Sequence, residues 1–406
     1  MSRWIGAIVG ATLLIGATCA MAQDWPQWRG VNRDGKLVKF VAPTTWPKEL
    51  SQKWKVDVGV GDSTPALVGD KLYVFTRQGE EEVTLCLDAA TGKEIWRGKY
   101  AAEAVARPAD SHPGPRSSPA VANGKVVTFG VGGVLTCYDA ATGKQLWQKD
   151  EFPKIVPAFF AAMSPIIVDK MCIAHLGGKG NGAVEAFDLA TGNMKWKWAG
   201  EGPAYASPMM MTVGGVKQVV VQTEASLVGL ALADGKLLWQ IPTPTQRMHY
   251  SSATPIIDGQ TVIFTGQGTG SRAVRIEKQG DTYSVKDLWS NPDIGSGFST
   301  PVLKEGLLFG ISDKNSFFCM DAKTGQADWV DTATRRDNFG AMIDAGSVIL
   351  GLPATSELIA FKPSAKAYEE VARLKVADTP TYAHPIISGK RVFVKDQENL
   401  ALYLIP

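Results

Sequence analysis

The sequence lacks a surplus of either charge. Its 42 Lys and Arg nearly balance its 40 Asp and Glu, which leaves a formal net charge of +2 over 406 residues. A nucleic-acid partner, which normally requires a basic surface, is therefore not expected. Beyond the first 22 residues the sequence also has no apolar run of about 18 residues, so it predicts no transmembrane helix.

Helical periodicity is scarce as well. Few stretches repeat apolar residues at the spacing of an amphipathic helix, whereas 42 Gly and 23 Pro are spread along the chain. Gly and Pro favour tight turns, and the segments between them are short and rich in β-branched and aromatic residues. The composition therefore predicts an all-β protein made of many short strands.

Motifs of enzyme and metal sites are missing too. The sequence contains no His-Glu-x-x-His, no Cys-x-x-Cys and no Gly-x-Ser-x-Gly. The glycine-rich stretches 177–182 and 266–270 lack the spacing of a phosphate loop and open no helix, so they are interpreted as hairpin turns. His175 is expected to be a packed core residue, and Glu224 and Asp313, which could reach a cation, are expected to be solvated. No catalytic residue and no metal ligand is predicted.

The N-terminus has the pattern of a secretory signal. Arg3 precedes an apolar run over residues 5–18, and small residues lead to Ala22. We expect residues 1–22 to be a signal peptide that is removed by cleavage after Ala22, which places the mature protein in the periplasm or outside the cell. Lipid attachment at Cys19 is the alternative, but residues 16–18 lack the Leu that usually begins such a site.

One eleven-residue pattern recurs five times, each time with a Gly four positions before a Trp. A period of about 40 to 50 residues indicates a repeat architecture in which each copy belongs to one structural unit. The copies are CLDAATGKEIW (86–96), CYDAATGKQLW (137–147), AFDLATGNMKW (186–196), GLALADGKLLW (229–239) and CMDAKTGQADW (319–329).

The first complete unit, residues 63–100, predicts four antiparallel strands. Apolar and β-branched segments at 64–68, 71–76, 83–87 and 94–96 are separated by turn sequences. Three hairpins join these segments into a four-stranded meander, which is one blade of a β-propeller. In the last turn, Asp and Thr side chains bond nearby backbone groups, and Gly supplies the positive φ that closes the turn.

The Trp at the end of each copy is expected to be structural. It lies at a fixed place on the outer strand, where a buried indole can lock one blade to its neighbour. We assign this docking role to Trp54, Trp96, Trp147, Trp196, Trp239, Trp289 and Trp329.

Counting the units gives eight blades, most of which open on a Ser-Pro or Thr-Pro pair. The units over residues 253–292 and 340–376 are degenerate, and the last unit is one strand short. Residues 52–56 resemble the missing outer strand, so they are expected to complete the last blade. The sequence therefore predicts one eight-bladed β-propeller over residues 50–406, closed by an N-terminal strand and preceded by a lead-in segment over residues 23–49.

Four cysteines remain after the predicted cleavage. Cys86, Cys137 and Cys319 occupy the same repeat position, so they lie on different blades and beyond the ~7 Å Cα separation that a disulfide allows. Cys172 lies in an apolar strand. We expect all four to be buried free thiols.

The repeats resemble the tryptophan-docking repeats of β-propellers of the pyrroloquinoline quinone (PQQ)-like family, and the likeness covers residues 50–406. Residues 24–30 and 32–35 look like the lead-in of many secreted bacterial members. The superfamily includes quinoprotein alcohol dehydrogenases and the non-enzymatic BamB-type lipoprotein of the outer-membrane barrel assembly machinery. Because these members differ in activity, the resemblance implies a fold and does not fix a function.

An enzymatic member would use PQQ with calcium. Quinoprotein alcohol dehydrogenases typically carry two adjacent cysteines above the cofactor, and this sequence has no Cys-Cys pair. It also has no motif on which their calcium-binding Glu and Asn or their catalytic Asp can be placed. We therefore expect no cofactor, and PQQ with calcium is implied only if the protein is a dehydrogenase.

Propeller topology predicts where a ligand would bind. Connections between blades, and hairpins between second and third strands, surround one mouth of the central channel, opposite the Asp-Thr-Gly turns. These connections hold three of the four His together with Arg and aromatic residues. They fit a pocket for an anionic or polar ligand, and the alternative is that they only pack the loops. The predicted ligand-binding residues are Arg107, His112, Arg116, Tyr205, Arg247, His249, Tyr250, Arg335, Arg336, Asn338, Tyr382 and His384, flanked by Phe159, Phe160, Phe298, Asp337 and Phe339.

Three functions follow as hypotheses. The first is a monomeric, non-catalytic binding or scaffold protein that binds a protein or polysaccharide partner across its rim or channel mouth. The second is a PQQ-dependent alcohol or sugar dehydrogenase. The third is an outer-membrane protein assembly factor.

Overall fold

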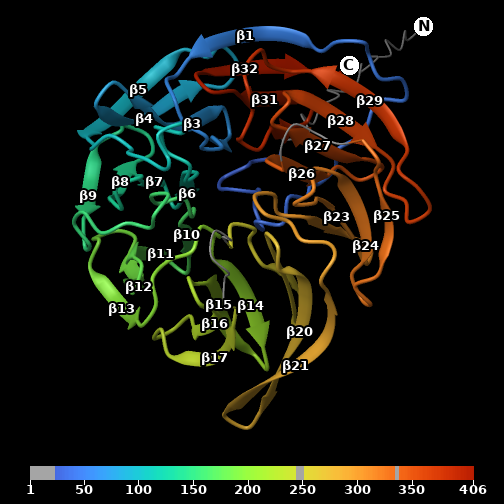
Figure 1. The fold of residues 1–406 in the computed structure, drawn as a ribbon. Helices are drawn as coiled ribbons and strands as arrows, with labels where there is room; N and C mark the ends of the chain where they lie inside the picture. Colours follow the sequence, from blue (N-terminus) through green and yellow to red (C-terminus); the bar gives the residue numbers. More distant parts are fainter. Residues whose placement is uncertain (1–22, 244–250, 334–337) are drawn as a thin grey trace, which may run out of the picture.

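The structure, a computed structural model, describes residues 23–243, 251–333 and 338–406. Over these residues it consists of β-strands joined by turns and loops, without a helix, so none is present that could span a membrane. The described strands form eight sheets of four antiparallel strands each. The sheets are blades arranged in a ring around a central axis (Figure 1). The predicted eight-bladed β-propeller is therefore confirmed.

The first four blades follow one another along the chain, and each runs from the channel outward. Their strands are β2 (Ala66–Val68), β3 (Lys71–Gln78), β4 (Glu81–Asp88) and β5 (Glu94–Ala101); β6 (Ala120–Ala122), β7 (Lys125–Phe129), β8 (Leu135–Asp139) and β9 (Gln145–Lys149); β10 (Ile166–Val168), β11 (Met171–Gly178), β12 (Asn181–Asp188) and β13 (Met194–Ala199); β14 (Met209–Val213), β15 (Val216–Gln222), β16 (Ser226–Ala231) and β17 (Leu237–Pro242).

The last four blades have the same order, except that the eighth takes its outer strand from the N-terminus. Their strands are β18 (Ile256–Asp258), β19 (Thr261–Gly266), β20 (Gly270–Gln279) and β21 (Thr282–Asn291); β22 (Val302–Lys304), β23 (Leu307–Ile311), β24 (Phe317–Asp321) and β25 (Ala327–Val330); β26 (Gly340–Asp344), β27 (Ile349–Pro353), β28 (Glu357–Phe361) and β29 (Glu370–Lys375); β30 (Ile386–Ser388), β31 (Arg391–Lys395), β32 (Asn399–Leu404) and β1 (Ser51–Asp57).

The position of a strand within its blade decides its sequence pattern. Second and third strands are covered on both faces by neighbouring blades, so residues 72–77 of β3 and 82–87 of β4 are buried without a break. The fourth strand faces solvent, and β5 accordingly alternates between more and less exposed residues. Continuous apolar segments therefore mark the interior of a blade, and alternating segments mark the rim of the ring.

The hydrophobic core is divided among the interfaces between blades. The largest cluster combines the first, seventh and eighth blades, for example through Leu67, Ile343 and Phe393. The cysteines lie in the core strands, and the prediction of buried free thiols is confirmed for Cys86, Cys137, Cys172 and Cys319.

β1 closes the ring. It pairs antiparallel with β32, with Lys55 opposite Ala401, and Figure 1 shows the two strands side by side although they come from opposite ends of the chain. Trp54 on β1 donates a hydrogen bond from Nε1 to the carbonyl oxygen of Ala89 in the first blade, at 3.3 Å. The predicted closure by an N-terminal strand is therefore confirmed.

The Asp-Thr-Gly turns have the predicted chemistry. Asp88 Oδ1 accepts hydrogen bonds from the hydroxyl and the amide of Thr91, at 2.7 and 2.8 Å. The Thr91 hydroxyl is the main cause that lowers the pKa of Asp88. Gly92 closes the turn at a φ of 72°. The same bonds recur at Asp139, Asp188 and Asp321.

Six of the seven Trp residues that were assigned a docking role donate a hydrogen bond to the next blade. Trp96 donates from Nε1 to the carbonyl oxygen of Ala140, which belongs to the turn of the second blade, at 3.1 Å. Equivalent bonds to the following blade are made by Trp54, Trp147, Trp196, Trp289 and Trp329.

Trp239 is the one member of this set that does not donate its hydrogen bond to the next blade. Its Nε1 donates to Oε1 of Gln218 within its own blade, at 2.6 Å. In the next blade the Asp-Thr-Gly turn is replaced by the long hairpin of β20 and β21, which extends beyond the ring in Figure 1. The docking Trp therefore finds its acceptor on the blade that carries it.

Candidate ligand-binding site at the channel mouth

The lead-in segment crosses the central channel. Trp25 forms an antiparallel bridge with Leu67 of β2, with 2.8 Å hydrogen bonds in both directions. The segment returns beside β26, where the amide of Leu37 donates to the carbonyl oxygen of Asp344 at 2.9 Å. Because β2 and β26 are innermost strands, residues 25–37 lie inside the ring, where Figure 1 shows the N-terminal part of the described chain in blue.

Two arginines of the lead-in tie it to blades on different sides of the channel. The side chains of Arg29 and Arg33 are only 2% exposed. Burial lowers the pKa of Arg29 to about 10, and burial together with the charge of Arg29 lowers the pKa of Arg33 to about 9. Both guanidiniums therefore stay protonated at neutral pH. Their acceptors in the blades are main-chain carbonyls at 2.6 to 3.0 Å, those of Thr300 and Pro301 for Arg29 and those of Ser164 and Pro165 for Arg33.

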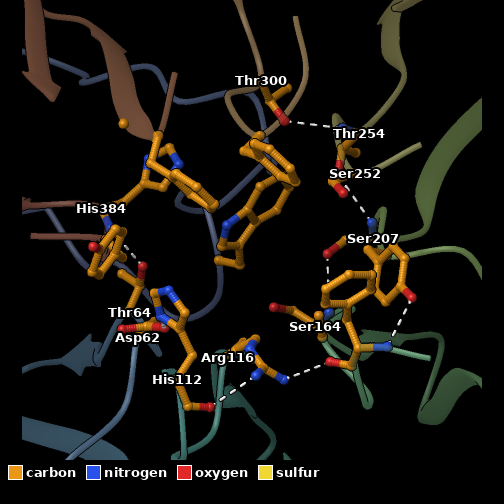
Figure 2. A pocket seen from close by; sticks show the side chains of 18 of the residues that line it. Asp62, Thr64, His112, Arg116, Ser164, Ser207, Ser252, Thr254, Thr300 and His384 are labelled. Carbon is orange, nitrogen blue, oxygen red and sulfur yellow. Dashed lines mark hydrogen bonds and ion pairs between the residues drawn. The ribbon is translucent and has the colours of Figure 1, made fainter. Parts of the chain in front are cut away.

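A cavity of about 410 Å³ lies at the mouth where the connections between blades meet. Trp28, at the tip of the lead-in, lines it from the channel side, and Gln267 lines it from the hairpin between β19 and β20. The cavity thus lies at the mouth that the topology predicted. We call it the mouth pocket (Figure 2), and its aromatic walls are Trp28, Phe159, Tyr205, Phe298, Phe339 and Tyr382.

A ring of hydroxyl groups surrounds the axis at the base of the connections. Each hydroxyl belongs to the Ser or Thr of the Ser-Pro or Thr-Pro pair that opens a unit, and its oxygen accepts a hydrogen bond from the amide at the same position of the preceding blade. Ser207 Oγ, for example, accepts from the amide of Ser164 at 2.9 Å. Gly340 occupies this position in the seventh blade and interrupts the series. The hydroxyl ring consists of Thr64, Ser118, Ser164, Ser207, Thr254 and Thr300.

His112 and Asp62 form a bonded pair in the wall of the mouth pocket (Figure 2). Nδ1 of His112 lies 2.6 Å from Oδ2 of Asp62. The imidazole also meets Tyr382 edge-on, with ring centres 4.7 Å apart, and it stacks on Phe339 at 6.1 Å. The carboxylate and the two aromatic rings therefore fix the orientation of His112.

Arg116 lies in the same wall and bonds only main-chain carbonyls among the described residues. Its Nη1 donates to Phe159 at 2.8 Å, and its Nη2 donates to His112 at 2.8 Å and to Ala109 at 3.4 Å. Burial lowers the pKa of the guanidinium. Arg116 thus holds two connections together and brings a positive charge to the pocket.

His384 lies beside the lead-in. It meets Trp28 edge-on, with ring centres 5.7 Å apart. Burial, and then the charge of Arg29, lower the pKa of His384 to about 3, so the imidazole is neutral at neutral pH. His384 therefore contributes a neutral polar ring to the pocket.

The mouth pocket brings together part of the predicted set. Arg107 stays apart, because its side chain is 92% exposed and pairs with Asp110 at 3.4 Å. Asn338 is buried outside the pocket lining, and Phe160 does not line the pocket either. The predicted residues that line it are His112, Arg116, Tyr205, Tyr382 and His384, with Phe159, Phe298 and Phe339. Outside the described residues lie Arg247, His249, Tyr250, Arg335, Arg336 and Asp337. A role in ligand binding stays a prediction for every residue of the predicted set.

Sequence reasoning missed three components of the pocket. Trp28 belongs to the lead-in, which carried no sign that it enters the channel. Asp62 precedes the first unit and has no partner nearby in sequence. The hydroxyl ring had a visible signal in the repeated Ser-Pro and Thr-Pro pairs, but these were interpreted only as the beginnings of units.

Two further expectations were wrong in their details. Glu224 and Asp313 are not simply solvated, because Glu224 Oε1 accepts from the amides of Gly180 and Gly202, at 2.8 and 2.9 Å, and Asp313 Oδ2 accepts from the amide of Gly268 at 3.0 Å. They satisfy backbone donors of the glycine-rich hairpins, and Glu224 also satisfies the amide of Gly202 in the connection between the third and fourth blades. His175 is buried as predicted, and Nε2 bonds the carbonyl oxygen of Glu201 at 2.9 Å.

Eight four-stranded blades, joined by Trp residues docked on Asp-Thr-Gly turns, define a PQQ-like β-propeller. The chain belongs to the family whose model is described as outer membrane protein assembly factor BamB, and this model matches residues 44–112 and 109–331.

Related proteins include both assembly factors and enzymes. The outer membrane protein assembly factor BamB of Burkholderia pseudomallei (strain K96243) is 25% identical over 367 residues, which cover 86% of each chain. The quinohemoprotein alcohol dehydrogenase of Comamonas testosteroni is 28% identical over 202 residues, which cover 45% of this chain and 27% of that protein.

Solved structures share the fold at low identity. The crystal structure of BamB from Moraxella catarrhalis has a TM-score of 0.64 at 14% identity and covers 87% of this chain and 97% of its own. The Comamonas testosteroni dehydrogenase has a TM-score of 0.68 at 16% identity, over 96% of this chain and 81% of its own. These likenesses support the propeller fold alone.

Proposed function

We propose that the protein is a non-catalytic binding protein that holds part of a protein partner in the mouth pocket. The observation that carries this proposal is the crossing of the channel by the lead-in, which makes Trp28 part of the pocket lining. An aromatic-walled pocket of about 410 Å³ is large enough for a side chain or a chain end of a partner.

The names of the relatives favour a protein partner over a polysaccharide. The family model and the Burkholderia relative both carry the name of an outer membrane protein assembly factor. We propose that the present protein acts as a monomer, because β1 completes the last blade and no second copy is needed to close the ring.

We also propose a location in the periplasm or outside the cell. The support is the signal pattern of residues 1–22, with cleavage after Ala22 and with lipid attachment at Cys19 as the alternative. Cell fractionation and the mass of the mature protein test this proposal. A measured mass equal to that of a chain that still begins at Met1 would contradict cleavage after Ala22. A lipid-modified Cys19 would favour attachment to a membrane through this residue.

We propose that the protein works without a cofactor. Calcium takes about six to eight oxygen ligands. Asp62 is the only carboxylate among the described residues that line the mouth pocket, and it is bonded to His112. The described residues also hold no group of three His, Cys, Asp or Glu that could bind a metal ion. The pocket therefore offers too few oxygen ligands for the calcium ion that accompanies PQQ.

Reconstitution tests the enzymatic alternative. The purified protein is incubated with PQQ and Ca²⁺, dialysed, and assayed for dye-linked oxidation of alcohols and sugars. We expect neither retained quinone absorbance nor turnover. A red-shifted quinone spectrum with turnover would show that the protein is a dehydrogenase.

Site-specific crosslinking tests the binding role. A photoreactive amino acid replaces Ala162, which lines the mouth pocket, or Thr91, which is exposed in a turn at the opposite end of the ring. In cells that naturally make the protein, we expect a discrete protein adduct from position 162 and none from position 91. Adducts from both positions, or from neither, would contradict the proposal, and a polysaccharide adduct would change the class of partner.

A further inference from the structure

We infer that the side of the ring opposite the mouth pocket docks on an anionic lipid membrane. The inference goes beyond the proposed function, because it concerns a different surface and a different kind of partner. Three observations on this side support it, namely the point at which the chain enters the ring, two exposed valines, and lysines that form no ion pair.

The chain enters the ring on the side away from the mouth, which we call the distal face. This face consists of the turns between first and second strands and of the Asp-Thr-Gly turns. The carbonyl oxygen of Gln23 accepts a hydrogen bond from Ser388 Oγ at 2.7 Å, and Asp24 Oδ1 accepts from the amide of Gly69 at 2.8 Å. Because Ser388 and Gly69 belong to such turns, residues 1–22 join the ring at the distal face.

Two valines of the lead-in protrude beside this point. Val38 is 59% exposed, and its amide donates to Gln23 Oε1 at 2.6 Å. Val41, at 85%, is the most exposed large hydrophobic side chain among the described residues. The carbonyl oxygen of Phe40, between them, lies 3.8 Å from where a Cβ of Gly346 would stand, in the turn between β26 and β27. The distal face therefore exposes apolar groups next to the entry point, as surfaces that insert between lipid headgroups do.

Free lysines give the distal face a positive charge. The carboxylates of its turns pair with basic neighbours, for example Asp169 with Lys217 at 2.8 Å and Glu305 with Lys304 at 3.4 Å. Five further lysines of the lead-in and of these turns form no ion pair among the described residues. They are Lys36, Lys39, Lys71, Lys170 and Lys390.

The mouth side has the opposite charge. Exposed carboxylates that form no ion pair in the described chain lie in the connections between blades and in the hairpins around the mouth. They are Glu80, Glu103, Asp150, Glu151, Asp293 and Glu398. The exposed lysines of these described loops are fewer, namely Lys154, Lys179 and Lys314. An anionic surface therefore attracts the distal face and repels the mouth side, which leaves the mouth pocket open to a partner.

Charge alone would also suit an anionic polysaccharide. A polysaccharide, however, offers no apolar layer for Val38 and Val41, whereas a membrane accepts apolar side chains and attracts lysines at the same time. The signal pattern of residues 1–22, with its apolar run over residues 5–18, also joins the ring at this face. These two observations favour the membrane.

Vesicle flotation tests the inference on the mature protein, residues 23–406, which carries no lipid. The vesicles contain phosphatidylcholine alone or an equal mixture with phosphatidylglycerol. We expect at least about tenfold more protein on the anionic vesicles, and loss of this binding in concentrated NaCl, because salt screens the attraction. Equal binding to both kinds of vesicle, or no binding to either, would overturn the inference.

The valines are tested by a double variant. Val38→Asp with Val41→Asp should reduce binding to the anionic vesicles at least about tenfold, because charged side chains resist transfer from water into the membrane. Ile155→Asp is the matched control, since Ile155 is 36% exposed in a connection on the mouth side, and it should bind as the unmodified protein does. The comparison of the two kinds of vesicle decides the inference even if a variant does not fold.

The lysines are tested in the same assay. Lys39→Gln with Lys390→Gln should weaken binding about tenfold, whereas Lys154→Gln with Lys179→Gln, on the mouth side, should not. If the lysine variant loses binding while the valine variant retains it, the distal face binds anions in general and a membrane is not its partner.

Failure of the inference and failure of the proposed function give different results. An adduct from position 162 without binding to vesicles would leave the binding role in place and refute membrane docking. Binding to anionic vesicles without an adduct from position 162 would support membrane docking and refute the protein partner at the mouth.

Discussion

The indole of Trp96 lies flat against Gly143, which belongs to the turn of the next blade. A Cβ atom at Gly143 would stand 2.6 Å from two carbon atoms of the indole, closer than such contacts occur. Gly143 also has a φ of 73°, which L side chains rarely adopt. The same glycine therefore closes its turn and allows two blades to dock.

Gly143→Ala should lower the free energy of unfolding by about 2–4 kcal/mol, because backbone strain and a clash with Trp96 add together. Gly124→Ala is the matched control: its φ is 68°, but nothing lies within 4 Å of a Cβ there, so a loss of about 1 kcal/mol is expected. Urea unfolding of both variants measures the difference. Equal losses of unfolding free energy in the two variants would show that the contact with Trp96 is not what requires a glycine at position 143.

Arg33→Met should lower the free energy of unfolding by about 2–4 kcal/mol. It leaves the carbonyls of Ser164 and Pro165, both bonded to the guanidinium at 2.9 to 3.0 Å, without their donor. The control Arg107→Met changes an exposed side chain and should shift stability by less than about 0.5 kcal/mol. Similar urea midpoints for both variants would contradict an anchoring role for Arg33.

Deletion of residues 51–57 should abolish cooperative unfolding. Without β1, the edge of β32 is exposed and the last blade loses the Trp54 contact to the first. Lys53→Ala is the control, because this exposed residue of β1 should tolerate the change. Thermal unfolding followed by circular dichroism distinguishes them. A deletion variant that melts as sharply as the full chain would show that closure by β1 is dispensable.

Acid should destabilise the protein partly through His175. Burial lowers the pKa of His175 to about 4, below its ordinary value of 6.5, so the unfolded chain binds a proton at a higher pH than the folded one. Stability from this group is present above about pH 6.5 and falls as the pH decreases toward about 4, by up to about 1.4 kcal/mol per pH unit.

His175→Gln should reduce that dependence, because an amide can donate to the carbonyl oxygen of Glu201 without titrating. Urea midpoints at pH 7 and pH 5 measure it. His384 acts in the same direction with a pKa of about 3, so a smaller slope should persist in the variant. Identical slopes in both proteins would show that His175 is not a titrating group in this range.

Short-range chemistry made the blades predictable. Asp88 and Thr91 form their turn from neighbours in sequence, and the Trp four residues after Gly92 has a fixed place on the outer strand. Trp54 made the ring closure predictable in the same way. It marks residues 52–56 as an outer strand that precedes the first blade, and the last blade was one strand short, so this strand was expected to complete it.

Contacts between distant segments were not predictable. Arg29 and Arg33 bond main-chain carbonyls, which every residue has, so no side-chain pattern marks their partners. The position of Trp28 depends on those bonds. His112 and Arg116 could be placed at the mouth because connections between blades must lie there, but the bond between His112 and Asp62 joins two different connections.

The path of the lead-in also constrains the order in which the protein can be completed. Gln23 accepts a hydrogen bond from Ser388, and β1 pairs with β32, so the residues synthesised first bind partners that are synthesised last. The strand β1 can therefore complete its pairing only after β32 has been synthesised. A chain truncated before β32 leaves β1 without its partner strand, and an unpaired strand of this kind can pair with another chain.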